Sequence, residues 1–260
     1  MKKIGFSKND IKRGLRIPNK IDRRISEEIG IHLGDGSLGI YKHKSGIKYS
    51  YTISGGYDDE EYFQNFIIPL MHKLYRIYPS TYKYRDRRSL ELHYQSKGLI
   101  FFKRSLGLPL GKKENLKIPD IVKNSKYKLD LIRGLFDTDG SLFFRKRNKK
   151  VNYYPCISIS NKNRIFIQEI TKLLNKKGFD VTMSTEKSKC SNGTLCVNTK
   201  LNINGKNSLL KWMKLIGTSH PKNLTKFSLW RKYGYIPKGI KPWERIELST
   251  SALPMRCSTD

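Results

Sequence analysis

The fold is decided by the stretch Ile132-Arg133-Gly134-Leu135-Phe136-Asp137-Thr138-Asp139-Gly140. A second copy of the same pattern lies upstream, at Glu28-Ile29-Gly30-Ile31-His32-Leu33-Gly34-Asp35-Gly36, and both copies continue as Ser-Leu. Each copy has apolar residues on one side, small residues between them and an Asp-Gly pair at its end. A unit of this kind that occurs twice in one chain indicates an internal duplication.

The segments that follow the two copies come in the same order. Each copy lies in a predicted helix, since apolar residues recur there at helical spacing, and is followed by a hairpin, a helix, a second hairpin and a third helix. The predicted helices cover residues 21–34, 58–74, 99–106, 129–138, 165–174 and 209–216; the predicted strands cover 38–41, 49–54, 82–85, 90–94, 142–145, 154–160, 179–184 and 195–203. We therefore expect an α+β fold in one pseudo-symmetric molecule. Gly36 is expected to end its helix in the left-handed conformation.

The repeats set the expected boundaries within the chain. Residues 21–110 form the first repeat and residues 125–237 the second, joined by a polar and basic linker at 111–124. Residues 1–20 are basic without clear periodicity, which indicates an N-terminal arm or a short helix. Residues 238–260 hold Ser, Thr and Pro and few helix or strand signals, so we expect a poorly ordered tail.

The chain is strongly basic. Its 260 residues hold 52 Lys and Arg against 22 Asp and Glu, a net charge of +30. This imbalance attracts polyanions and indicates a nucleic-acid protein whose affinity comes largely from counterion release; a generally basic surface of the ribosomal kind is the simpler alternative, and an anionic membrane is a weaker one. No apolar run reaches membrane-spanning length. The four cysteines show no zinc spacing, which favours reduced thiols in a cytosolic protein.

Small residues recur four positions apart in both copies, at Gly30 and Gly34 and at Gly134 and Thr138. A glycine inside a helix costs about 1 kcal/mol relative to alanine. Its repeated use indicates that two helix backbones approach each other closely, as small residues allow in membrane helices. The four positions are therefore predicted to form the interface between two helices.

If these two helices pack side by side and parallel, Asp35 and Asp139 meet at their C-terminal ends. Two like charges repel there, and each faces the negative end of a helix dipole. A divalent cation held by carboxylate, carbonyl and water oxygens resolves this conflict, and the hard oxygen ligands favour Mg²⁺. A single Asp-Gly pair is more typical of a turn that ends a helix, but two copies in a chain of charge +30 favour metal-assisted phosphodiester hydrolysis.

At these two motifs the chain resembles a monomeric, two-motif LAGLIDADG homing endonuclease. The second motif, at 134–140, matches closely; the first, at 30–36, has Leu33 where an earlier Asp is usual and keeps the last one, Asp35. By repeat order the resemblance covers about residues 21–237. It implies an αββαββα fold in each repeat, two antiparallel four-stranded saddle sheets for the DNA major groove, and the motif helices at the repeat interface.

The resemblance also implies an activity. It implies an intron-encoded, sequence-specific endonuclease that cuts both strands of a long double-stranded DNA site and leaves short 3′ overhangs. Asp35 and Asp139, with Gly34 and Thr138 beside them, would hold Mg²⁺, for which Mn²⁺ would substitute. We expect a monomer without membrane contact, in the cytoplasm of a prokaryote or in an organelle.

Further site residues follow from the same resemblance. A polar or basic residue commonly ends the second strand of each repeat, and Asn161 and Lys162 match it in the second repeat. In the first repeat the corresponding Gly55-Gly56 supplies no side chain. Lys162 is therefore a candidate for assisting catalysis, although a solvated or phosphate-contacting lysine is an equal alternative.

A second family lysine follows the last helix of a repeat. Lys113 fits it best, with Lys112 as its rival, and Lys222 is the weaker counterpart in the second repeat. Lys113 is thus the other candidate for catalysis. Asn161 and Lys222, from the resemblance, are expected to contact DNA. The other expected contacts, from the alternate positions of strands and their ends, are Arg85, Arg87, Arg145, Arg147 and Lys187.

Two further expectations follow. The halves are unequal, because Asp137 has no acidic partner at Leu33 and Lys162 has no basic partner at Gly56, so the two DNA strands are expected to be cut at different rates. The same scaffold could also serve an RNA maturase that binds its intron RNA, or a non-catalytic DNA-binding protein. Retention of Asp35 and Asp139 favours the enzyme.

Overall fold

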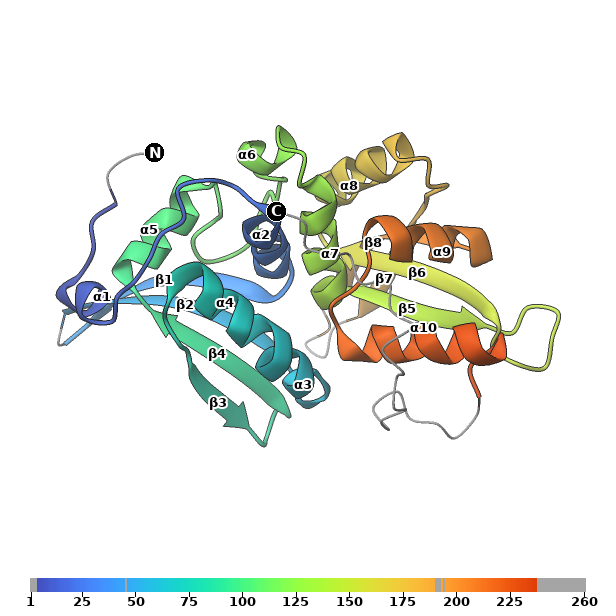
Figure 1. Cartoon of the computed structure of the whole chain (residues 1–260), viewed down its shortest axis with the longest axis horizontal. Helices are drawn as coiled ribbons and strands as arrows, with labels where there is room; N and C mark the ends of the chain where they lie inside the picture. Colours follow the sequence, from blue (N-terminus) through green and yellow to red (C-terminus); the bar gives the residue numbers. More distant parts are fainter. Residues whose placement is uncertain (1–3, 45, 190–192, 194, 238–260) are drawn as a thin grey trace.

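The computed structural model describes residues 4–44, 46–189, 193 and 195–237. Two similar halves lie side by side, and the helices α2 and α7 meet between them (Figure 1). The first half contains α2 (Arg23–Asp35), β1 (Gly36–His43), β2 (Gly46–Gly56), η1 (Tyr57–Asp59), α3 (Glu60–Tyr62), η2 (Phe63–Ile67), α4 (Ile68–Tyr75), β3 (Ser80–Tyr84), β4 (Ser89–Gln95) and α5 (Lys97–Ser105). The second contains α7 (Lys128–Asp139), β5 (Gly140–Arg145), β6 (Tyr154–Asn161), α8 (Arg164–Lys176), β7 (Thr182–Lys189), β8 (Leu195–Asn204), α9 (Lys206–Leu215) and α10 (Pro221–Tyr233).

Each half holds one four-stranded antiparallel sheet. The strand orders are β1-β2-β4-β3 and β5-β6-β8-β7, so the two sheets have the same topology. They also have the same register, because Gly36 pairs with Ile53 in the first sheet and Gly140 pairs with Ile159 in the second. The predicted α+β fold of two duplicated repeats is confirmed.

One face of each sheet is covered by helices and carries the core. Along β4 the buried residues Leu90, Leu92 and Tyr94 alternate with more exposed ones, and β8 shows the same alternation. Helix α5 packs on β2, while α8 and α9 pack on β6 and β8. We call the opposite side of each sheet its outer face. Because successive side chains of a strand point to opposite sides of the sheet, the polar residues lie on this face.

The motif helices α2 and α7 touch through their backbones. A Cβ atom added to Gly30 would lie 2.0 Å from the carbonyl oxygen of Leu131, and one added to Gly134 would lie 2.0 Å from the carbonyl oxygen of Glu27. At Gly34 the added atom would lie 2.0 Å from Oγ1 of Thr138. We call this contact the seam. The seam has room only for small residues, as predicted for the interface between these two helices.

The glycines that end the motif helices do so for a different reason from the one predicted. Gly36 has φ −83° and Gly140 has φ −100°, so both are extended and neither is left-handed. A Cβ atom on Gly140 would lie 2.5 Å from the carbonyl oxygen of Phe136, and one on Gly36 would lie 2.6 Å from Cα of His32. Glycine therefore lets a strand leave directly from the last turn of each helix.

Several segments differ from their predictions. The second helix of the first half is interrupted by the π-helical η2, and Phe179 lies before β7 as a buried core residue. Helix α10 was missed, since its apolar residues follow no clear stripe. The predicted arm contains α1 (Lys8–Lys12), whose buried Asp10 accepts a hydrogen bond from the backbone N–H of Gly98. The predicted linker contains α6 (Asp120–Lys123), and the predicted tail at 238–260 lies outside the described residues.

A buried ion pair fastens α5 to α2 in the first half. The side chains of Glu28 and Lys103 are both 0% exposed and form a hydrogen-bonded pair. The hydroxyls of Tyr51 and Tyr75 donate to the same carboxylate, at 2.9 and 3.1 Å. Because every oxygen of Glu28 is satisfied, the charge is tolerated in the core.

Cys156 is buried and free, whereas the expectation of reduced thiols is wrong for Cys196, which is disulfide-bonded.

Gly134→Ala is expected to lower the free energy of unfolding by about 3 kcal/mol or more, because its methyl group forces the seam apart. Gly5→Ala is the matched control, since nothing lies within 4 Å of its added Cβ atom. Urea unfolding of both variants measures the effect. Equal stability of the two variants would show that the seam is not tightly packed.

Lys103→Met is expected to destabilise the fold by about 3–5 kcal/mol, because it leaves the charge of Glu28 buried without its partner. The double variant Glu28→Gln with Lys103→Met removes both charges and is expected to recover part of that loss. A double-mutant cycle by urea unfolding measures the coupling between the two residues. A coupling of zero would contradict the pairing.

Candidate active site

Two carboxylates lie where the motif helices end. Asp35 is the last residue of α2 and Asp139 is the last residue of α7, and the seam holds the two helices together up to these ends. Burial raises the pKa of Asp35 to about 7, with the charge of Asp139 as the next cause. Burial also raises the pKa of Asp139. The site therefore carries more negative charge than its surroundings stabilise, which is the condition that favours a cation.

Lys113 is brought to the carboxylates from the segment after α5. Its Nζ donates hydrogen bonds to the carbonyl oxygens of Leu33, at 3.1 Å, and of Gly34, in the last turn of α2. Burial lowers the pKa of Lys113, while Asp139 and Asp35 oppose that shift. A lysine here offsets the negative end of the helix. Its rival Lys112 is exposed.

The two halves differ beside the carboxylates. Asn161, at the end of β6, donates from Nδ2 to Oδ2 of Asp139 at 3.2 Å, which counters the upward shift of that aspartate's pKa. The structure thus directs Asn161 to the carboxylate site. Gly55 is the equivalent residue at the end of β2 and has no side chain to offer. Lys162 is exposed in the bend after β6, and no hydrogen bond or ion pair is found for it among the described residues.

A cavity of about 140 Å³ adjoins Asp35 between the two halves. Lys222, predicted to contact DNA, lines it from the first turn of α10. Lys226 lines it one turn later; its Nζ donates to the carbonyl oxygen of Leu142 at 2.8 Å, and burial lowers its pKa to about 8, with the charge of Lys222 adding to the shift. Sequence reasoning missed Lys226 because it missed α10.

The ligands present suit a hard divalent cation. Asp35 and Asp139 offer carboxylate oxygens, and Gly34 and Thr138 precede them in the same helix turns. The Thr138 hydroxyl donates to carbonyl oxygens within its own helix, at 3.0 and 3.1 Å, so it serves the helix. In the described part of the chain, no group of three His, Cys, Asp or Glu side chains is placed to hold a metal. The two carboxylates fit Mg²⁺, which keeps several waters and uses one or two carboxylates.

Of the predicted DNA-contacting residues, the four arginines lie on an outer face or at the hairpin ends. Arg85 and Arg87 lie exposed in the turn between β3 and β4, and Arg147 lies in the loop after β5. Arg145 lies beside Phe143 on the outer face of the second sheet. Lys187 is exposed and follows Glu186 on β7, and neighbouring residues of a strand point to opposite faces. Because the carboxylate of Glu186 pairs with Lys200 on the outer face, Lys187 lies on the opposite face.

The structure adds residues that the sequence pattern did not indicate. Lys200 extends over the ring of Phe143, at 5.8 Å from its centroid, and so joins the outer face of the second sheet. Asp59 and His220 form a pair across the two halves, with 3.1 Å between Oδ1 and Nε2. Pairing between residues 161 positions apart leaves no signal in local spacing.

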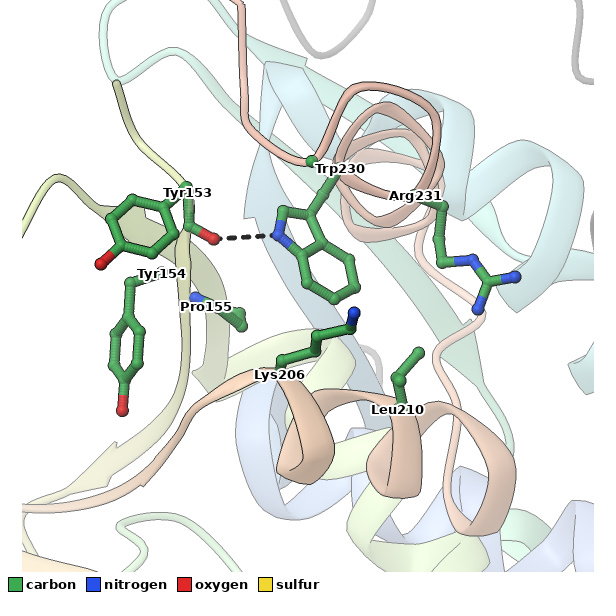
Figure 2. Close-up of a pocket in the computed structure, with 8 residues that line it drawn as sticks. Tyr153, Tyr154, Pro155, Lys206, Leu210, Trp230 and Arg231 are labelled. Atoms are coloured by element: carbon green, nitrogen blue, oxygen red, sulfur yellow. Dashed lines mark hydrogen bonds between the residues drawn. The ribbon is translucent and has the colours of Figure 1, made fainter. Parts of the chain in front are cut away.

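Another cavity, of about 430 Å³, lies between β6, α9 and α10 (Figure 2). Its lining includes Tyr154, Lys206, Trp230 and Arg231, and the indole of Trp230 donates to the carbonyl oxygen of Tyr153 at 2.9 Å. It contains no acidic side chain and none of the predicted site residues. The candidate chemistry therefore lies at the seam.

Asp35→Asn is expected to stabilise the metal-free protein by about 2 kcal/mol at pH 8, less than the full pKa shift implies because Asp35 is partly exposed. The raised pKa means that the folded state holds its proton up to about pH 7, whereas the unfolded state loses it near pH 4. The gain should therefore vanish at pH 4 and grow between pH 4 and 7. Urea unfolding in EDTA at several pH values measures it, with Asp58→Asn as a surface-charge control; a gain independent of pH contradicts it.

Comparison with known proteins agrees with the duplicated fold. The model of a LAGLIDADG-like domain matches residues 126–217. An uncharacterized protein of Methanocaldococcus jannaschii is 27% identical over 164 residues, which are 62% of this chain and 56% of the relative, so the chain matches little more than half of that relative's length. Among solved structures, a variant of I-DmoI in complex with its target DNA is 21% identical, covers 75% of this chain and 95% of its own, and has a TM-score of 0.54. The LAGLIDADG homing endonuclease I-GzeII in complex with a DNA target is 11% identical, with coverages of 83% and 90% and a TM-score of 0.50. The chain thus carries a LAGLIDADG-like domain in its second half and has, as a whole, the duplicated fold of the monomeric LAGLIDADG homing endonucleases.

Proposed function

We propose that the chain is a sequence-specific double-strand DNA endonuclease that hydrolyses phosphodiester bonds with a divalent metal and leaves short 3′ overhangs. The observation that carries the proposal is the pair of carboxylates, Asp35 and Asp139, at the seam of two otherwise similar halves. Each carboxylate belongs to one half, as cutting two antiparallel strands requires. The solved structures of I-DmoI in complex with its target DNA, in the presence of magnesium or manganese, support the choice of metal.

Asp35 and Asp139 would hold the metal, with Gly34 and Thr138 in the helix turns beside them. When bound, a divalent metal supplies an activated water and neutralises charge on the phosphate. Lys113, half-buried at the end of α2 and within electrostatic reach of both aspartates, stabilises negative charge that develops on the phosphate. Asn161 orients Asp139 through its hydrogen bond. Lys162 is exposed and free to contact a phosphate of the bound DNA.

The outer faces of the two sheets supply DNA binding. The net charge of +30 provides the sequence-independent part of the affinity, which weakens as salt rises. The base-reading part comes from side chains along the strands and at their ends, where arginine reads guanine. The residues proposed for these contacts are Arg85, Arg87, Arg145, Arg147 and Lys200. Lys187 is not among them, because it lies on the opposite face of its strand. The proposed partner is therefore a long duplex site bound by a monomer.

An intron-encoded homing endonuclease is the biological setting that we propose. The alternatives are an RNA maturase that binds its intron RNA and a DNA-binding protein without catalysis. Both aspartates are present, and burial raises the pKa of each carboxyl. The folded state therefore bears the free-energy cost of two buried carboxylates. A binder has no need of that cost, and this favours the enzyme. Within the described residues, no helix is long and apolar enough to cross a membrane.

Asp139→Asn is expected to reduce cleavage of both strands by at least about 100-fold while leaving specific DNA binding within about twofold. The substitution keeps the size of the side chain and its contact with Asn161, but removes a charge that holds the metal. The duplex target is first selected from a random-sequence library by binding in Ca²⁺. Cleavage is then measured in Mg²⁺, with Asp58→Asn as the control for charge.

The outcome separates the alternatives. Cleavage of the selected duplex by Asp139→Asn at the native rate would overturn the assignment of the site. Specific binding without cleavage by the native chain, in either Mg²⁺ or Mn²⁺, would favour the non-catalytic DNA-binding protein. Tight binding of intron RNA and faster splicing, undiminished when both aspartates are replaced, would favour the maturase.

A further inference from the structure

The two halves have equivalent strand ends but different side chains at them. Gly36 pairs with Ile53 and Gly140 pairs with Ile159, so Gly55 is the register equivalent of Asn161. Asn161 contacts Asp139 in the second half. The first half lacks that contact from its own strand, and its aspartate, Asp35, would have no polar neighbour at this position.

The carboxylate of Asp59 lies above Gly55. A Cβ atom added to Gly55 would lie 3.0 Å from Oδ2 of Asp59 and 2.8 Å from the ring of Phe63. The same Oδ2 accepts a hydrogen bond from the backbone N–H of Gly56 at 2.8 Å. Glycine at position 55 therefore clears the space that the Asp59 side chain occupies. A polar group is thus supplied to the first half from the helical turn η1 instead of the strand.

His220 of the second half fixes the other oxygen of Asp59. The backbone N–H of Lys222 donates to Nδ1 of His220 at 3.2 Å, so Nε2 carries the proton and donates to Oδ1 of Asp59 at 3.1 Å. The ring of His220 stacks on Tyr62, with 4.6 Å between centroids. The His220 side chain is only 8% exposed, whereas that of Asp59 is 30% exposed. The histidine is locked in place, and the carboxylate stays accessible.

The segment before α10 is held by both motif helices. Asp137 of α7 accepts hydrogen bonds from the Thr218 hydroxyl and, at 2.7 Å, from the backbone N–H of Ser219. The Ser219 hydroxyl donates to Glu27 of α2 at 2.9 Å. This anchoring explains why the second motif carries an acid at Asp137. The first motif has the buried Leu33 at the equivalent position, so it cannot anchor such a segment. A histidine is therefore presented from the second half to the first and not the reverse.

The cavity beside these residues is lined by polar side chains. Asp35, Asp59, Tyr62 and His220 all line it. The Tyr62 hydroxyl is buried and has no hydrogen-bond partner within the described residues. A cavity of about 140 Å³ that carboxylates line has room for several bound water molecules.

We propose that Asp59, oriented by His220 of the other half, takes the place of Asn161 in the first half and holds the attacking water for one of the two DNA strands. Asp59 is then a catalytic residue that accepts a hydrogen bond from the water, and His220 is a positioning residue. The inference rests on the proposed endonuclease function and assigns a chemical cause to the inequality of the halves. One half uses a neutral amide beside its aspartate, and the other uses a carboxylate held by histidine.

The test follows the two strands separately. The selected duplex carries a different label on each strand, and both cleavage rates are measured in Mg²⁺. Asp59→Asn is expected to slow one strand by about 10- to 100-fold, the loss expected when a reacting group is no longer held in place, and to accumulate nicked DNA. Asn161→Ala is expected to slow the opposite strand. Asp58→Asn, an exposed neighbour with the same charge change, should alter neither rate.

His220 variants separate positioning from folding. His220→Ala should slow the same strand as Asp59→Asn, and His220→Gln, whose amide can donate to Asp59, should restore part of that rate. Binding to the duplex in Ca²⁺ and the thermal midpoint of Asp59→Asn should stay close to those of the native chain.

Equal slowing of both strands by Asp59→Asn, or no slowing, overturns the inference and leaves the endonuclease intact. No cleavage by the native chain overturns the proposed function itself, and with it this inference.

Discussion

The backbone contact between α2 and α7 is the constraint on which the rest of the structure depends. Gly30 and Gly134 each lie so close to the opposite helix that a methyl group would meet a carbonyl oxygen at 2.0 Å. Asp35 and Asp139 each lie five residues after the seam glycine of their own helix, so the contact brings the two carboxylates to the same end of the seam. Burial, and after it the charge of Asp139, raises the pKa of Asp35 to about 7, so the two carboxylates are in electrostatic conflict. Lys113 relieves part of this conflict, and a divalent cation would relieve the rest.

The duplicated frame supports two unlike halves. The second motif keeps Asp137, whose carboxylate is buried and holds the segment before α10; the first keeps Leu33, which is buried without a polar role. Ser219 donates to Glu27 and His220 pairs with Asp59, so residues of the second half contact the first half. A pseudo-symmetric fold can thus carry two different chemical environments for two DNA strands. Symmetry in the backbone does not impose symmetry on the chemistry.

Charged groups lie in different environments in different parts of the structure. The core of the first half tolerates the buried pair of Glu28 and Lys103 because four groups meet with their hydrogen bonds satisfied. Exposed arginines lie at the hairpin ends, and Lys200 on the outer face of the second sheet pairs with Glu186. Near the carboxylates Asp59 pairs with His220, while burial lowers the pKa of Lys226 and raises the pKa of Asp35. Perturbed groups that gather at one place between two halves are typical of a functional site.

The sequence by itself determined the duplication, the order of helices and strands, the small residues of the seam and the position of the two aspartates. These features are local: periodicity, glycine spacing and the repeated Asp-Gly pair are written within a few residues. Only the tertiary structure decided what surrounds the aspartates. Asp59 and His220 are 161 positions apart, and Lys226 lies on α10, whose residues show no clear apolar stripe. Their places depend on how two halves pack across the seam, because contacts between distant segments leave no trace in the spacing of either one.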